Sequence, residues 1–232
     1  MKVARLFSLV LVAVVALSAM VASTASAIPK FKLPITKRNF TAESKTSTLA
    51  VGAETDIVTC PSSKSNGTIL GDDEISVDIL YTGCALKEKA GGECKVDSGS
   101  GAKEPGLIIT SLLTGLLGLV LPGGAAGILF EPTTGDENSF VKLLPLTGCT
   151  GANEEKAVEG SVAGVFTPTG KSSKTAEIIL TLTGSVGARK QAVTQIDTLL
   201  GLIKPKLTSF GALASVQLQT AVVTFEENVE VD

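Results

Sequence analysis

Most of this 232-residue chain consists of short segments in which apolar and polar residues alternate. The clearest example is 75–81, where Ile, Val, Ile and Tyr alternate with Ser, Asp and Leu, as in a half-buried strand. The alternation recurs in 176–182 and in 216–222, where we expect Val216, Leu218 and Val222 to share the buried face. The pattern predicts an all-β fold, either an antiparallel β-sandwich or a barrel-like domain. The expected turns between strands are Asn66-Gly67, Gly91-Gly92, Thr134-Gly135-Asp136 and Thr169-Gly170-Lys171.

The first 27 residues have the three parts of a secretory signal peptide. Lys2 and Arg5 supply positive charge, 7–21 is uncharged and mostly apolar, and Ala25-Ser26-Ala27 supplies the small residues needed for cleavage. The apolar stretch is shorter than the roughly 20 residues that span a bilayer. We therefore expect a signal peptide helix at 1–27, cleavage after Ala27, and a secreted, extracellular protein with no stable membrane span.

The mature chain is expected to comprise a leader and one domain. Residues 28–47 contain two prolines and five basic residues against one acidic residue, which is typical of a flexible basic leader. Residues 48–232 then form a single β-sandwich-like domain of ordinary length for that class. Removal of the signal peptide lowers the formal net charge from −3 to −5. A chain with this balance lacks the basic footprint of a nucleic-acid-binding protein.

The segment 105–130 contains no charged residue. A transmembrane helix is one interpretation, but Gly115 and Gly118 interrupt the run, and Pro122-Gly123-Gly124 ends it before it reaches the length of a bilayer span. Two buried strands joined at Pro122-Gly123-Gly124 explain the pattern better, because strands buried on both faces are apolar throughout. A membrane-inserting hairpin and an exposed patch that binds a partner are the alternatives.

One stretch shows helical periodicity. Apolar residues recur at a spacing of three and four in 193–203, and Pro205 ends the run. A short helix is therefore one interpretation of 191–204, whereas Gly201 and the β-rich surroundings favour an extended chain.

Four cysteines follow the signal peptide: Cys60, Cys84, Cys94 and Cys149. An even number in an exported chain predicts two disulfide bonds, with three possible connectivities. The glycines at 91 and 92 let the chain turn back between Cys84 and Cys94, so we favour this pair and, by elimination, Cys60–Cys149. The chain has no histidine and no Cys-x-x-Cys pair, so metal binding by these cysteines is disfavoured, and we expect no cofactor.

The recurring units of the chain include "ISVDILYTGC", "AAGILFEPTTG", "VEGSVAGVFTP" and "TFEENVEV". Their order resembles that of a group of secreted proteins of unknown function in soil actinobacteria. The resemblance runs from about Cys60 onward and includes the Thr-Gly-Cys endings at Cys84 and Cys149. It implies an exported bacterial β domain with disulfide bonds, brings no catalytic residues, and favours extended structure over 191–213.

The absence of histidine excludes a Ser-His-Asp triad, a Cys-His pair and a His-ligated zinc site. Paired carboxylates are the remaining enzymatic option, since a glycosidase needs two of them about 5–9.5 Å apart. Such acidic turns are usually solvated, so we assign no catalytic, cofactor-binding or metal-binding residue. The acidic residues gather in three turns, Asp72-Asp73-Glu74, Asp136-Glu137 and Glu154-Glu155.

Residues 144–148, "LPLTG", match the signal by which sortases attach exported proteins to a Gram-positive cell wall. That signal works close to the C-terminus, ahead of an apolar segment and a positive tail. Here the chain after Gly148 is polar and acidic. We interpret the match as coincidental and the segment as a strand that leads to Cys149.

Together these features predict a non-catalytic extracellular or cell-envelope-associated module with a binding or structural role. Its candidate partners are a cell-envelope polymer and another secreted protein. The alternatives are a carboxylate-based extracellular hydrolase, if two acidic turns converge, and a membrane-active protein that uses 105–130.

Overall fold

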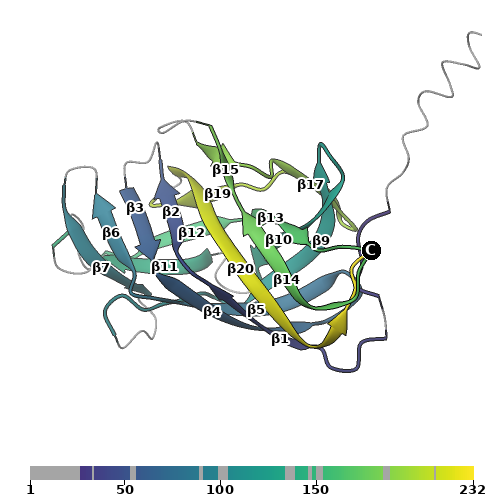
Figure 1. The fold of residues 1–232 in the computed structure, drawn as a ribbon. Coiled ribbons are helices and arrows are strands. Elements are labelled where there is room, and N and C mark those ends of the chain that lie inside the picture. Colours follow the sequence, from purple (N-terminus) through teal and green to yellow (C-terminus); the bar gives the residue numbers. More distant parts are fainter. Residues whose placement is uncertain are drawn as a thin grey trace, which may run out of the picture.

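The computed structural model describes residues 27–32, 34–52, 56–88, 91–98, 104–133, 139–145, 148–149, 154–184, 189–211 and 213–232. The predicted signal peptide lies outside these residues except for Ala27. Within them the regular structure consists of β-strands, and the paired strands all run antiparallel (Figure 1). The prediction of an all-β, barrel-like fold is confirmed.

Eight strands close into a first barrel-like ring, here called ring 1. Each strand is hydrogen-bonded to the next, and the eighth returns to the first through pairs such as Val77 with Leu113. Around ring 1 the order is β9 (Leu113–Leu121), β10 (Ala125–Pro132), β13 (Val162–Thr167), β14 (Ser173–Leu180), β20 (Leu213–Val229), β1 (Asn39–Ser44), β4 (Ser62–Ile69) and β5 (Glu74–Thr82).

A second closed circuit, ring 2, shares β20 with ring 1. It uses the first part of β20, whereas ring 1 uses the remainder. From β20 the order is β2 (Ser47–Val51), β3 (Asp56–Cys60), β6 (Ala85–Glu88), β7 (Glu93–Ser98), β11 (Ser139–Pro145), β12 (Lys156–Gly160) and β19 (Leu207–Ser209), which pairs again with β20.

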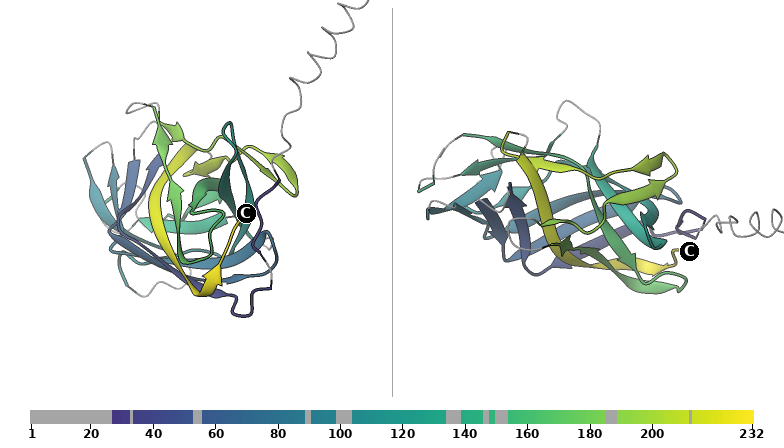
Figure 2. Two further views of the ribbon diagram at one scale, coloured as in Figure 1. Left: turned by 45° about the vertical axis from the view of Figure 1, so that its right-hand side comes forward. Right: turned by 90° about the horizontal axis from the view of Figure 1, so that it is seen from above.

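The rings are stacked end to end, because several strands pass from one ring into the other (Figure 2). Only one or two residues separate β1 from β2, β3 from β4, β5 from β6, and β12 from β13. We call this level the junction. Pro61 lies there between β3 and β4, where its missing N–H interrupts the hydrogen-bond ladder. The residues of the junction between these strand pairs are Lys45, Thr46, Pro61, Gly83, Cys84 and Ser161.

Among the described residues, five short strands lie outside the two circuits. β8 (Ile108–Ile109) pairs with β5, and β17 (Gln195–Thr198) pairs with the end of β9 and with β18 (Gly201–Ile203). β15 (Leu182–Thr183) and β16 (Lys190–Gln191) form a separate two-stranded sheet.

The inside of both rings is filled by apolar side chains. In β5 the predicted alternation is observed, with Ile75, Val77 and Tyr81 buried. One cluster of buried residues extends from Leu86 in ring 2 to Phe225 in ring 1. Burial of apolar surface stabilises a fold by roughly 25 cal/mol per Å². Because the two rings share one buried core, neither ring keeps this stabilisation without the other, and they form one folding unit.

The structure resolves the two ambiguous segments. Residues 113–132 form the buried strands β9 and β10, joined at Pro122-Gly123-Gly124, which confirms the preferred interpretation of 105–130. The helix considered for 191–204 is wrong, because these residues form β17, a turn and β18. Edge pairing with β9 provides a backbone ladder that the local helical periodicity does not reveal.

Residues 28–47 are part of the domain and not a flexible leader outside it. Phe31 and Ile35 are buried, and Phe31 forms a β-bridge with Val231. β1 lies between β20 and β4, so ring 1 does not close without it. The domain therefore begins before the predicted boundary at residue 48. The high content of basic residues led to the prediction of a flexible leader. In the structure their side chains point outward, while the apolar side chains between them point inward.

Two predictions about individual strands are also wrong. Asn66-Gly67 lies inside β4, where Gly67 leaves room for the Phe40 ring; a Cβ at Gly67 would lie 2.1 Å from Phe40 Cζ. In β20, Leu218 and Val222 are exposed, and the side chains of the alternate positions face inward. The turn at Thr169-Gly170-Lys171, between β13 and β14, is confirmed.

Candidate functional site

All four cysteines form disulfide bonds, as predicted, but the favoured pairing is wrong. The bonds are Cys60–Cys84 and Cys94–Cys149. Two disulfide bonds are compatible with folding in an oxidising compartment.

The register of ring 2 explains the correct pairing. β6 and β7 are neighbours, but Cys94 faces Leu86 and is therefore two positions out of step with Cys84. The β3–β6 ladder, extended by one residue, places Cys60 directly opposite Cys84, and their Cα atoms are 4.1 Å apart. The short sequence separation between Cys84 and Cys94 favoured the wrong pair, because sequence separation carries no information about which residues of two paired strands lie opposite each other.

The predicted strand ahead of Cys149 is present, since Leu144 and Pro145 end β11. Leu146 and Thr147 of the sortase-like motif lie outside the described residues. Cys149 itself is covalently fixed to Cys94 on β7.

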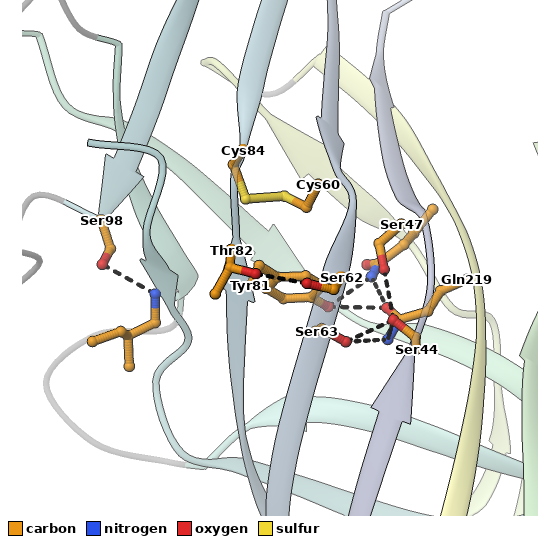
Figure 3. The surroundings of a disulfide bond; sticks show 12 residues. Ser44, Ser47, Cys60, Ser62, Ser63, Tyr81, Thr82, Cys84, Ser98 and Gln219 are labelled. Atoms are coloured by element: carbon orange, nitrogen blue, oxygen red, sulfur yellow. Dashed lines mark hydrogen bonds between the residues drawn. A yellow bond between two sulfur atoms is a disulfide. The ribbon is translucent and has the colours of Figure 1, made fainter. Parts of the chain in front are cut away.

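A buried polar cluster lies at the junction beside the Cys60–Cys84 bond (Figure 3). The Tyr81 hydroxyl donates to Gln219 Oε1 at 3.0 Å and accepts from Gln217 Nε2 at 3.1 Å. Gln219 Nε2 in turn donates to the hydroxyls of Ser44 and Ser63, which lie 2.7 Å from each other. Because each side chain of this cluster has partners, its burial avoids the cost of unsatisfied polar groups.

Tyr81 is fully enclosed, and its burial raises the pKa of its hydroxyl to about 12, despite the hydrogen bonds from Gln217 and to Gln219. Between pH 10 and 12 the folded protein therefore keeps a proton that the unfolded chain releases. The resulting stability is fully present below pH 10 and is lost as pH rises through 12. The loss amounts to about 2–3 kcal/mol in total.

Tyr81 is the single tyrosine and the chain has no tryptophan, so tyrosinate absorbance reports this residue alone. We expect its titration midpoint near pH 12 in the folded protein and near pH 10 in denaturant. Tyr81→Phe should remove its share of the alkaline loss of stability while leaving that of Lys30 and Lys32, whose carboxylate partners raise their pKa. A folded-state midpoint near 10 would show that the hydroxyl is accessible to solvent.

A cavity of ≈ 100 Å³ lies inside the barrel next to this cluster. Its walls come from both rings, for example Leu49 and Val58 of ring 2 and Ile75 and Phe130 of ring 1. Among the described residues that line it, none carries a charge at neutral pH. The polar groups in its wall are Ser47, Thr48, Ser65, Tyr81, Thr110, Gln217 and Gln219.

The lining of this cavity favours uncharged, apolar molecules over charged ones. An uncharged apolar molecule replaces empty space with dispersion contacts, and an apolar cavity of about 150 Å³ lined by Leu, Ile and Phe binds benzene. A charged molecule would lose its hydration without gaining a countercharge. The hydroxyl and amide groups in the wall can form a hydrogen bond with one polar group of a ligand.

Sequence reasoning missed this site, because its polar members lie on different strands far apart in the chain. Tyr81 and Gln219 are 138 residues apart in sequence. Two features were available as signals, namely the single tyrosine and the Gln-x-Gln at 217–219 inside an apolar run.

The described acidic turns pair with neighbouring lysines. Asp72 lies 2.7 Å from Lys30 Nζ, and this hydrogen bond is the main reason why the pKa of Asp72 is lowered. Burial is the main reason why the pKa of Asp73 is raised. Glu154 lies 3.7 Å from Lys156. The third turn, Asp136-Glu137, lies outside the described residues.

The fold and the cavity define a class, a closed antiparallel β-barrel of two stacked rings with an uncharged interior cavity. No protein-family model, curated protein or solved structure matches this chain. In the part of the chain that the structure describes, no helix is long and apolar enough to cross a membrane. Nor do the described Cys, Asp and Glu side chains form a group of three that could hold a metal ion.

Proposed function

We propose that this protein is a non-catalytic, secreted or cell-envelope-associated module that binds a small, uncharged, apolar ligand inside its barrel. The observation that carries the proposal is the cavity at the junction, which is apolar over most of its wall and free of charge among its described lining residues. The volume of ≈ 100 Å³ is about two-thirds of that of a cavity that binds benzene, so the proposed ligand is about the size of a short alkyl chain or one small ring.

Two features support the location outside the cytoplasm. The N-terminal pattern of 1–27 is that of a cleaved signal peptide. Both disulfide bonds are typical of proteins that fold in an oxidising compartment.

The barrel provides the rigidity that a binding site needs. Most cavity residues lie on strands of the two closed rings, which are paired on both sides, and the Cys60–Cys84 bond fixes β3 to the start of β6 beside the site. The conformational cost of binding is therefore small, because the walls are ordered before the ligand arrives.

We expect benzyl alcohol to bind to the folded protein and benzoate to bind at least a hundredfold more weakly. The two ligands have similar size, but the carboxylate must leave water for a cavity without a countercharge. Calorimetric titration measures both affinities, and the NMR signals of the Tyr81 ring report whether binding occurs inside the barrel. Equal affinity for the two ligands would contradict an interior site.

Ala221 lines the cavity and is buried, so Ala221→Leu should fill it. We expect this variant to lose benzyl alcohol binding without losing stability. Ala214 lies on the same strand with its side chain exposed, which makes Ala214→Leu the matched control. If neither variant changes binding, or if the native protein binds no uncharged probe, the proposed function is wrong.

A further inference from the structure

The hairpin formed by β17 and β18 is a layer added to the outside of ring 1. β17 pairs with the end of β9, so that Ile196 faces Val120 (Figure 1). Ile196 and Val193 are buried against Leu116 and Leu129, in a small core separate from the barrel interior. One side of the hairpin is thus anchored to the barrel wall.

The turn of this hairpin and strand β18 after it together expose three leucines to water. The exposed fractions are 52% for Leu199, 76% for Leu200 and 56% for Leu202. Among the large hydrophobic residues that are exposed in the described part of the chain, Leu200 has the highest exposed fraction. Single exposed leucines are ordinary, but three within four residues at the end of one hairpin form an apolar tip.

The chain around this tip is basic, although the whole chain is acidic. Residues 189–206 contain four basic residues and one acidic residue, whereas the formal net charge of the protein is −3. Leu202, Lys204 and Lys206 are exposed, and the residues between them are half-buried. The lysines therefore follow the apolar tip along the same exposed side of the chain.

An apolar tip backed by lysines fits an anionic lipid surface better than other occupants. The leucines enter the boundary between headgroups and acyl chains while the lysines remain near the lipid phosphates. A soluble polyanion would satisfy the lysines but leave the leucines in water. A second copy of this hairpin would bring like charges together.

We propose that the β17–β18 hairpin docks the protein peripherally on an anionic lipid membrane through Leu199, Leu200 and Leu202. The contact is reversible and does not span the bilayer. It does not depend on the proposed ligand of the barrel cavity.

The test is sedimentation with vesicles that contain phosphatidylglycerol, compared with vesicles of phosphatidylcholine alone. The native protein should bind the anionic vesicles and should dissociate as salt is raised. The double variant Leu199→Ser with Leu200→Ser should bind at least tenfold more weakly, because it removes the inserted apolar surface. Lys204→Gln with Lys206→Gln should weaken binding roughly thirtyfold at low salt.

Val222→Ser is the matched control, since Val222 is 45% exposed and lies on β20, which is four strands away from β9 in either direction around ring 1. This variant should bind like the native protein. The proposal is overturned if the leucine variant binds normally, or if phosphatidylcholine vesicles bind equally well. It is also overturned if sedimentation equilibrium shows a dimer that only the leucine variant dissociates. Binding to a soluble polyanion with no affinity for vesicles would overturn it as well.

Discussion

Replacing Cys94 and Cys149 together with alanine is expected to lower the free energy of unfolding by about 4 kcal/mol. The bond closes a loop with a sequence separation of 55 residues and ties β7 to the segment after β11. The Cys60–Cys84 bond closes a shorter loop of 24, for which the same chain-entropy argument predicts about 3.5 kcal/mol. Urea unfolding of the two double variants measures both values.

Two controls distinguish the effect of losing a disulfide bond from the effect of losing side-chain contacts in the core. Cys84 is completely buried, so its replacement also removes core contacts. Non-reducing peptide mapping should find Cys60 joined to Cys84 and Cys94 joined to Cys149 in the native protein. Peptides in which Cys84 is joined to Cys94 would refute the register of ring 2. A loss below about 1 kcal/mol for both variants would mean that the unfolded chain is already compact.

Gly160→Ala is expected to destabilise the protein by about 4 kcal/mol or to prevent ring 2 from closing. Gly160 has a φ of +102°, and a Cβ on it would lie 2.0 Å from the Lys206 carbonyl oxygen. That oxygen accepts a hydrogen bond from the Ser161 N–H. The methyl group therefore pushes β19 away from β12 at the junction.

Gly123→Ala is the matched control for this substitution. Gly123 has a similar φ of +123°, but no atom lies within 4 Å of the position that a Cβ would take there. We expect a cost of about 1–2 kcal/mol from backbone strain alone. The difference between the two variants in thermal unfolding isolates the contact with Lys206. Equal effects would show that the β12–β19 pairing tolerates a shift.

The predictions that succeeded depend on neighbours in sequence. The burial of Ile75, Val77 and Tyr81 follows from the period of one strand, and the turn at Pro122-Gly123-Gly124 follows from residues that break strands. These signals established an all-β fold. They do not distinguish a sandwich from a closed barrel, because closure depends on pairs such as β5 with β9.

The predictions that failed depend on residues far apart in the chain. Asn66-Gly67 predicts a turn because Asn-Gly is a common turn dipeptide. The actual reason for the glycine is the Phe40 ring, which belongs to another strand and is not a neighbour in sequence. The inward position of Gln219 depends on Tyr81, its hydrogen-bond partner. The candidate cavity could not be predicted for the same reason, since its wall is assembled from both rings.

β20 completes both circuits, and every other described strand precedes it in the chain. Neither ring can close until residues 213–229 are available, however much of the preceding chain is present. During synthesis from the N-terminus, the growing chain consequently exposes open sheet edges until this last strand is complete. Contacts of such long sequence separation also make folding slow. The architecture thus delays cooperative folding until β20 is available, which makes the preceding interval the period of greatest exposure to proteases and aggregation.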